Sequence, residues 1–209
     1  ALALFSQVGQ ALGVTLGVNL VNALVLGLLL SFGTMSRIRP VSALSKLYVY
    51  LMRSTPLMLQ LAIVYYLPGF LNPGHMLSRM TAACLAFVLN YAAYFSEIFR
   101  GGIQGVPLGQ REAGQVLGMT KSQIFFKVTL LQVIKRIVPP MGNEVITLIK
   151  DTSLANFIMV KEIIAMAKEF GNKAMIWPLF YAGVFFLVFN GIVTVALSRT
   201  EKKLDYFRV

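Results

Sequence analysis

The chain of 209 residues is 57% hydrophobic and 13% charged, with a mean hydropathy of +0.72. These values exclude a soluble domain of ordinary composition, so lipid must be the main solvent of this protein. The formal net charge of +11 does not indicate nucleic-acid binding, because the 19 Lys and Arg residues are spread between apolar runs. The single cysteine, Cys84, excludes an internal disulfide and a cysteine metal site.

Five apolar runs approach the roughly 20 residues that a membrane-spanning helix needs. They cover about residues 8–34, 50–71 and 79–99, a fourth run from about 137, and 176–198. The second run opens on RSTP (53–56), where a proline in the first turns costs the helix little. The string PGFLNPG (68–74) predicts a short outer loop.

These runs predict an all-α integral membrane protein with about five transmembrane helices, forming a single domain over residues 1–209. No basic region precedes the first run and no small-residue cleavage site follows it. We therefore expect that run to be kept as a span rather than removed as a signal. The only histidine, His75, lies in the predicted outer loop, and one such residue does not indicate a metal site.

The distribution of positive charges predicts how the chain is oriented in the membrane. With the N-terminus outside, only five of the 19 Lys and Arg residues fall elsewhere than in the inner loops and tail: Arg79, Lys150, Lys161, Lys168 and Lys173. Because cytoplasmic loops are enriched in Lys and Arg, this places residues 100–136 and the C-terminus in the cytoplasm. The same distribution predicts that the N-terminus lies outside.

The polar segment at 100–136 carries the signals of two helices joined by a tight turn. Pro107 can start a helix, and Gly118 can end it in the left-handed conformation. Thr120, three residues before Gln123, predicts a capping box for the next helix. A short rigid helix with Glu112 near its middle suits insertion into a groove on a partner protein. The alternative is a solvated connector.

The segment also carries a recognisable signature, and the chain resembles the permease subunits of ATP-binding-cassette importers for polar and basic amino acids over nearly its whole length. The signature of that family is Glu-Ala-Ala, three residues, Gly, nine residues, then Ile-x-Leu-Pro. Here it reads Glu112-Ala113-Gly114, then Gly118, then VTLL (128–131). Gly114 replaces the second alanine, and Leu131 replaces the proline. The strings RSTP (53–56), YFSEIFRGGI (94–103) and LIKDTSL (148–154) are also similar to the amino-acid branch.

The resemblance implies a type I importer permease that forms a dimeric translocation path with a second permease, the same chain or a similar one. It implies that an extracellular or periplasmic substrate-binding protein delivers the substrate and that Glu112, Ala113, Gly114 and Gly118 couple the path to a cytoplasmic ATPase dimer. ATP and Mg would be bound by that partner, and no cofactor by this chain. Consistent with this, the sequence contains no GxxxxGK[ST] phosphate loop.

Ionisable residues at membrane depth are costly, and they line cavities or pair with one another. Lys150 and Asp151 interrupt the fourth apolar run and are followed by Thr152, Ser153 and Asn156. These residue types predict a broken helix, and we hypothesise that its new N-terminus receives the α-carboxylate of the substrate. The alternative is an ion pair that only fixes the bundle.

Three further acids lie at or near membrane depth. Glu162, at the start of the amphipathic stretch 161–170, is an open candidate for binding a substrate ammonium or guanidinium group. The alternative is a solvated face shared with Lys161 and Lys168. Glu97 is expected to pair with Arg100 on the same helix face. Glu144, like Glu97, lies toward the cytoplasmic end of its span, and for both we favour a structural role.

The sequence therefore predicts a non-enzymatic permease for polar, and by its acidic residues basic, amino acids. An ion-coupled secondary transporter or a channel is the alternative, and it predicts transport by the isolated protein without ATP. An intramembrane enzyme would need a set such as GxSG or HExxH, and neither string is present.

Overall fold

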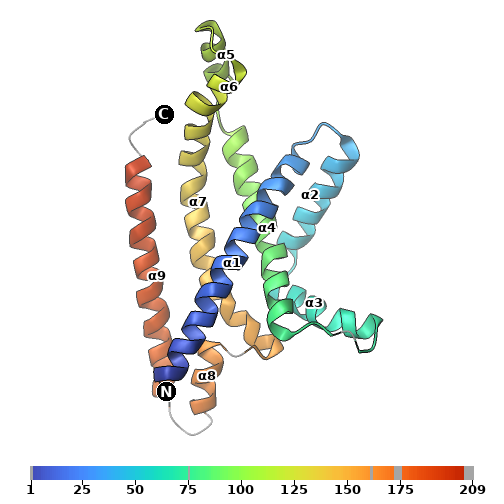
Figure 1. The fold of residues 1–209 in the computed structure, drawn as a ribbon, viewed down its shortest axis with the longest axis vertical. Helices are drawn as coiled ribbons and strands as arrows, with labels where there is room; N and C mark the ends of the chain where they lie inside the picture. The colour runs from blue at the N-terminus through green and yellow to red at the C-terminus, as the bar shows by residue number, and fades with distance from the viewer. Residues whose placement is uncertain (1, 75, 161, 172–175, 205–209) are drawn as a thin grey trace.

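The computed structural model describes residues 2–74, 76–160, 162–171 and 176–204, and every regular element in these ranges is helical (Figure 1). This confirms the all-α class. His75, Lys161 and Lys173 lie outside the described residues. The elements are α1 (Leu2–Thr34), α2 (Arg39–Ser54), α3 (Leu57–Leu71), α4 (Arg79–Gln104), α5 (Leu108–Val116), α6 (Lys121–Ile124), the π-helix η1 (Phe125–Thr129), α7 (Leu130–Asp151), the 3-10 helix η2 (Thr152–Ile158), α8 (Ile163–Gly171) and α9 (Trp177–Leu204).

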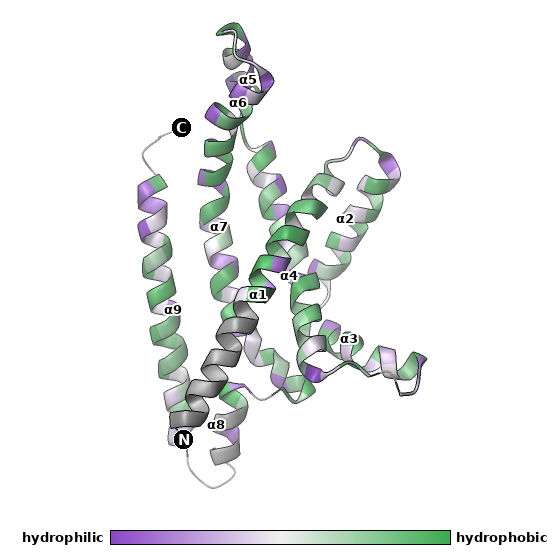
Figure 2. Ribbon diagram, in the orientation of Figure 1, coloured by the Kyte–Doolittle hydropathy of each residue, from purple (hydrophilic) through white to green (hydrophobic). Residues whose placement is uncertain are grey.

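Three helices in the described chain are long and apolar enough to cross a membrane, namely α1 over Gly17–Thr34, α4 and α9. The green stretches of Figure 2 follow these helices. A fourth span is reached only if α2 and α3 are counted together. The remaining predicted span, α7, has 22 residues but includes five charged ones, among them Glu144. The prediction of about five spans therefore depends on a bent helix pair and a polar helix.

The second predicted span is not one straight helix, and this part of the sequence interpretation was wrong. Helices α2 and α3 meet at an angle of 108°. Pro56 is the N-cap of α3, and Thr55 before it is extended, as residues before proline usually are. The predicted outer loop is also shorter than expected, because α3 continues through Pro68 to Leu71.

Helix α4 is the centre of the bundle and contacts α1, α2, α3 and α7. The most extensive helix contact is between α4 and α1, and small residues allow it: a Cβ added at Gly27 would lie 2.8 Å from Cβ of Phe95. Ala92 and Phe95 are fully buried. Helix α4 also runs five residues beyond its predicted end at 99, through both glycines of the string RGG (100–102).

The helix that carries the fourth predicted span begins far earlier than residue 137. The chain is helical without interruption from Lys121 through α6, η1 and α7 to Asp151. Pro139 and Pro140 lie inside α7 and do not end it. At the predicted break after Lys150, the structure shows a change from α-helix to 3-10 helix at Thr152 rather than a new helix N-terminus. Figure 1 places the α5–α6 region at one end of the molecule and α8 at the other.

Candidate functional site

The hairpin formed by α5, Gly118 and α6, here called the coupling hairpin, is built as the sequence predicts. Gly118 has a φ of +72°, which is the left-handed conformation that favours glycine. The backbone N–H of Gln123 donates to the Thr120 hydroxyl at 3.3 Å, and the Thr120 N–H donates to Oε1 of Gln123 at 2.8 Å. The capping box is therefore confirmed.

Close packing joins the two arms of the coupling hairpin. Gly114 is buried, and a Cβ at this position would lie only 2.8 Å from Cγ1 of Ile124. Gly114 therefore lets α5 lie directly on Ile124, which is itself 4% exposed. Glu112 and Ala113 are exposed on the other side of α5.

The outer surface of the coupling hairpin carries large apolar side chains. Val116 is 87% exposed and Leu117 is 78% exposed, next to the exposed carboxylate of Glu112. Exposed apolar residues beside a charged group are typical of a surface that another protein covers. The hairpin is also tied to the bundle, because Nε2 of Gln132 on α7 donates to Oε1 of Gln110 on α5 at 3.2 Å.

The break between α7 and η2 has a different geometry from the one hypothesised. The N–H of Thr152 donates to the carbonyl of Leu148, so α7 passes into η2 without a free helix N-terminus. The hydroxyls of Thr152 and Ser153 donate to the carbonyls of Ile149 at 2.7 Å and Lys150 at 2.8 Å. The break therefore does not offer a new set of unpaired backbone N–H groups, because helical geometry continues through it.

Asp151 is held by a tyrosine rather than by the neighbouring lysine. The Tyr91 hydroxyl of α4 donates to Oδ2 of Asp151 at 2.8 Å, and Tyr91 is 2% exposed. Lys150 is exposed, and no Lys150–Asp151 ion pair is present in the described chain. The alternative was an ion pair that only fixes the bundle, and the two ion pairs of the described chain involve neither residue. The chain then leaves η2 through Met159, whose φ is +59°.

Glu162 is neither open nor solvated, contrary to both interpretations of the sequence. It is 2% exposed, and its carboxylate accepts the backbone N–H groups of Ile164 at 2.8 Å and Ala165 at 2.6 Å. This is the geometry of a helix N-cap, here for α8.

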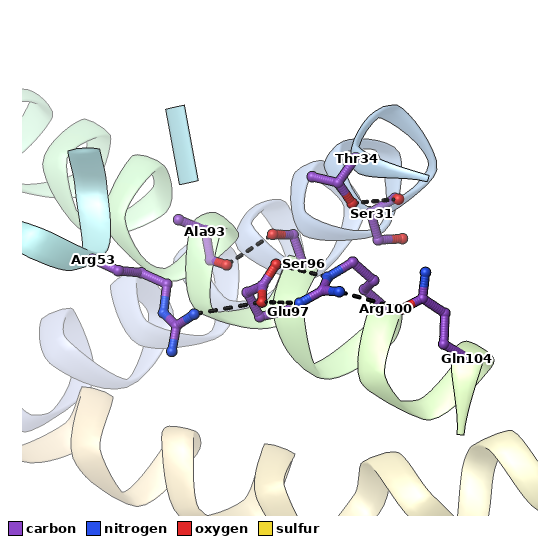
Figure 3. Close-up of polar contacts among 8 residues, drawn as sticks. All are labelled: Ser31, Thr34, Arg53, Ala93, Ser96, Glu97, Arg100 and Gln104. Atoms are coloured by element: carbon purple, nitrogen blue, oxygen red, sulfur yellow. Dashed lines mark hydrogen bonds and ion pairs between the residues drawn. The ribbon is translucent and has the colours of Figure 1, made fainter. Parts of the chain in front are cut away.

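The pairing of Glu97 with Arg100 is confirmed, and a second arginine joins it. Arg100 donates through Nη2 and Nε to the two Glu97 oxygens at 2.5 Å and 3.0 Å. Arg53 of α2 approaches the same carboxylate at 3.5 Å, as Figure 3 shows, and its guanidinium lies 5.4 Å from the ring centre of Tyr94. Arg53, Tyr94 and Glu97 line a cavity of about 480 Å³, together with Glu144 and Arg136 of α7.

Sequence reasoning missed a buried amide pair next to the α2–α3 bend. Nδ2 of Asn90 donates to Oε1 of Gln60 at 2.9 Å, and Nε2 of Gln60 donates to the Met52 carbonyl at 2.9 Å and to the Thr55 hydroxyl at 2.8 Å. Gln60 thus satisfies the last carbonyls of α2 where the helix ends. An amide inside an apolar run was a signal for such a role, because polar groups at membrane depth need partners.

A protein family described as the binding-protein-dependent transport system inner membrane component matches residues 23–205. The L-cystine transport system permease protein TcyB of Bacillus subtilis (strain 168) is 36% identical over 193 residues, which cover 90% of this chain and 81% of that protein. The arginine transport system permease protein ArtQ of the same organism is 36% identical over 201 residues, covering 93% and 91%. A crystal structure of an amino acid ABC transporter with histidines matches with a TM-score of 0.81 at 29% identity, covering 90% of this chain and 88% of that one.

Proposed function

This chain belongs to the family of binding-protein-dependent transport system inner membrane components, and on that premise we propose how it carries amino acids and where its partners bind. It is the permease subunit of an amino-acid ATP-binding-cassette importer. The two relatives described above are named for the transport of cystine and of arginine. ATP hydrolysis belongs to a partner subunit. Polar amino acids, with basic ones preferred, are the proposed cargo.

The observation that carries the proposal is the coupling hairpin. It presents an exposed carboxylate, Glu112, beside the exposed apolar side chains of Val116 and Leu117 on a short helix fixed by Gly114 and Gly118. We propose that this surface enters a groove on a cytoplasmic ATPase dimer, which binds ATP and Mg. The tie between Gln110 and Gln132 then passes movement of the hairpin to α7.

The same proposal sets the orientation and the other partners. The coupling hairpin lies in the cytoplasm, with the C-terminus on the same side and the N-terminus outside, in a bacterial inner membrane. A second permease chain completes the translocation path, and a substrate-binding protein delivers amino acids to the outer face. The bilayer covers the exposed apolar face of α9, including Leu187 and Ile192.

Within the membrane, we propose that the substrate passes the junction of α7 and η2, where Asp151, Thr152, Ser153 and Asn156 contact it. Asp151 is only partly buried and is oriented by Tyr91. Its carboxylate attracts an ammonium or guanidinium group, which agrees with a basic cargo. Glu162, whose two oxygens accept backbone N–H groups, acts indirectly by holding α8 against η2.

Reconstitution into liposomes tests the proposal. The chain with its native partners should accumulate labelled arginine only when ATP and the ATPase subunits are present. Substrate should also stimulate ATP hydrolysis across a panel of amino acids. Transport by the isolated chain, driven by an ion gradient without ATP, would overturn the proposal and favour an ion-coupled secondary transporter or a channel.

A further inference from the structure

A second cavity lies between the end of α4 and the coupling hairpin. Its volume is about 660 Å³, and α4, α5, α6 and η1 all contribute to its lining. The polar side chains that line it are Gln104, Arg111, Lys121 and Thr129. No acidic residue is among the lining residues, so the cavity has a net positive charge.

The two cations of this cavity are not neutralised by the described chain. Both ion pairs in the described residues involve Glu97, and neither involves Arg111 or Lys121. Both side chains are exposed, as is Gln104 at the end of α4. Two converging cations without a carboxylate form a site for an anion, and the guanidinium fork of Arg111 matches a phosphate group.

The apolar rim of the cavity indicates which kind of anion fits. Leu108 is 65% exposed and Phe125 is 48% exposed, and both line the cavity. The adjacent Phe126 is 62% exposed, with its ring centre 5.0 Å from that of Phe125. A charged interior with apolar side chains at its edge suits a molecule that has both an anionic head and an apolar tail.

The length of α4 places this cavity at the level of lipid head groups. Its 26 residues extend about 39 Å at 1.5 Å per residue. The hydrocarbon core of a bilayer is about 30 Å thick, and about 40–45 Å with its head groups. Because α4 exceeds the core, its last residue, Gln104, reaches the head-group region, and the cavity lies directly beside it.

The cavity and the proposed ATPase-docking surface use different sides of α5. At 100° per residue, Arg111 lies about 100° around the helix from Glu112 and about 140° from Val116. Leu108 and Arg111, three positions apart, share the side that lines the cavity. An anion in the cavity therefore leaves Glu112 and Val116 free for a protein partner.

We propose that this cavity binds the phosphate head group of an anionic phospholipid from the cytoplasmic leaflet, with Arg111 and Lys121 as its ligands. Basic pockets beside transmembrane helices on that side are suited to such head groups. The bound lipid fixes the base of the coupling hairpin to the membrane surface. The leaflet assignment rests on the proposed function, whereas the lipid site itself does not require transport.

Lipid retention by the assembled transporter tests the proposal. The complex is placed in nanodiscs of phosphatidylcholine with a minor fraction of phosphatidylglycerol, and phosphatidylglycerol binding is measured by native mass spectrometry. Arg111→Gln with Lys121→Gln should weaken binding about thirtyfold, since each basic residue near an anionic lipid contributes about fivefold. Arg39→Gln with Lys46→Gln removes the same charge from exposed positions on α2 and should leave binding unchanged.

Two further variants guard against misfolding and against the wrong occupant. Lys121→Gln alone, outside α5, should weaken binding about fivefold. Arg111→Lys keeps the charge but loses the guanidinium fork, so it should weaken binding less than the double variant does. Equal binding in the double variant and the α2 control would overturn the proposal. Displacement of the lipid by millimolar inorganic phosphate would overturn the proposal in favour of a free anion. If the double variant loses the ATPase subunits but still binds lipid, the cavity is a contact with that partner and the proposal is also overturned. Transport is assayed separately, so failure of the importer function is distinguishable from failure of the lipid site.

Discussion

Two glutamates at opposite ends of the molecule, Glu112 and Glu162, were both expected to act on another molecule, and the structure separates them. Glu112 is exposed on the coupling hairpin. Glu162 is 2% exposed, and both of its oxygens accept backbone N–H groups. A carboxylate whose acceptors are already used holds the fold together. One that is exposed beside uncovered apolar side chains is available to a partner.

The comparison also separates two kinds of sequence signal. The coupling hairpin depends on residues within about four positions of each other, such as Thr120 and Gln123, and its prediction is correct in detail. The opposite end depends on contacts between distant segments, such as Tyr91 with Asp151, which are 60 residues apart. Local helix signals predict contacts between neighbouring residues, but not contacts between distant segments.

The largest expected effect is that of Glu112→Lys. Substrate-stimulated ATP hydrolysis by the assembled transporter should fall about thirtyfold or more, because an uncompensated charge at a protein contact costs about 2–5 kcal/mol. Subunit association, measured by size-exclusion chromatography, should weaken as well. Glu201→Lys makes the same charge change on α9 and should keep coupling. Full coupling in the Glu112 variant would remove the difference between the two glutamates.

The next effect concerns the proposed substrate path at the junction of α7 and η2. Ser153→Leu should raise the amino-acid concentration for half-maximal ATPase stimulation tenfold or more, because a hydrogen bond to a charged group contributes about 1.5–3 kcal/mol. Thr194 on α9 makes a similar hydroxyl-to-carbonyl bond, 2.7 Å long, to Asn190. Thr194→Leu is therefore the matched control. If the two variants respond alike, the substrate contact at Ser153 is refuted.

Glu162→Ala should affect stability and not substrate recognition. Loss of an N-cap costs about 0.5–2 kcal/mol, and the amides of Ile164 and Ala165 should exchange hydrogen faster by a corresponding amount. Glu162→Asp can still cap the helix and should restore most of the protection. The substrate concentration for half-maximal stimulation should stay at its original value. A large increase would mean that Glu162 contacts substrate after all.

An effect of similar size is expected at the turn of the coupling hairpin. Gly118→Ala forces an alanine into a φ of +72°, which costs roughly 1–2 kcal/mol for a residue with a Cβ. Hydrogen exchange in α6 should rise several-fold, while the α8 amides stay protected. Gly109→Ala, inside α5 with open space around its added Cβ, is the control and should not increase exchange. Equal behaviour of the two variants would show that the turn does not limit the hairpin.

Much of the fold could be predicted from periodicity and helix signals. The class, the helical coupling segment with Gly118 and the Glu97–Arg100 pair are all confirmed. The α2–α3 bend was missed because Pro56 suits the first turn of a continuing helix as well as the N-cap of a new one. The Gln60 amide distinguishes a new helix from a continuing one, because it lies on α3 and donates to a carbonyl at the end of α2.

The helix of the fourth predicted span begins well before the apolar run that marks the span. Residues 121–136 include Lys127, Lys135 and Arg136, and polar character was taken as the limit of the span. A helix that leaves the membrane can continue in water or against a partner, so hydropathy marks the bilayer boundary and not the end of the helix. The role of Glu162 could not be predicted either, because a cap is recognised only when the first residue of the helix is known.

The narrow winding of η2 has a consequence for the residues that follow Asp151. A 3-10 helix has three residues per turn and rises about 2.0 Å per residue, so positions three apart stack in straight rows. Ala155 and Ile158 form one row, which is buried, whereas Ser153 and Asn156 form the neighbouring row. An α-helix would have turned Asn156 about 60° away from Ser153. The 3-10 winding instead aligns a hydroxyl and an amide about 6 Å apart along the axis, so that a polar row lies beside an apolar row.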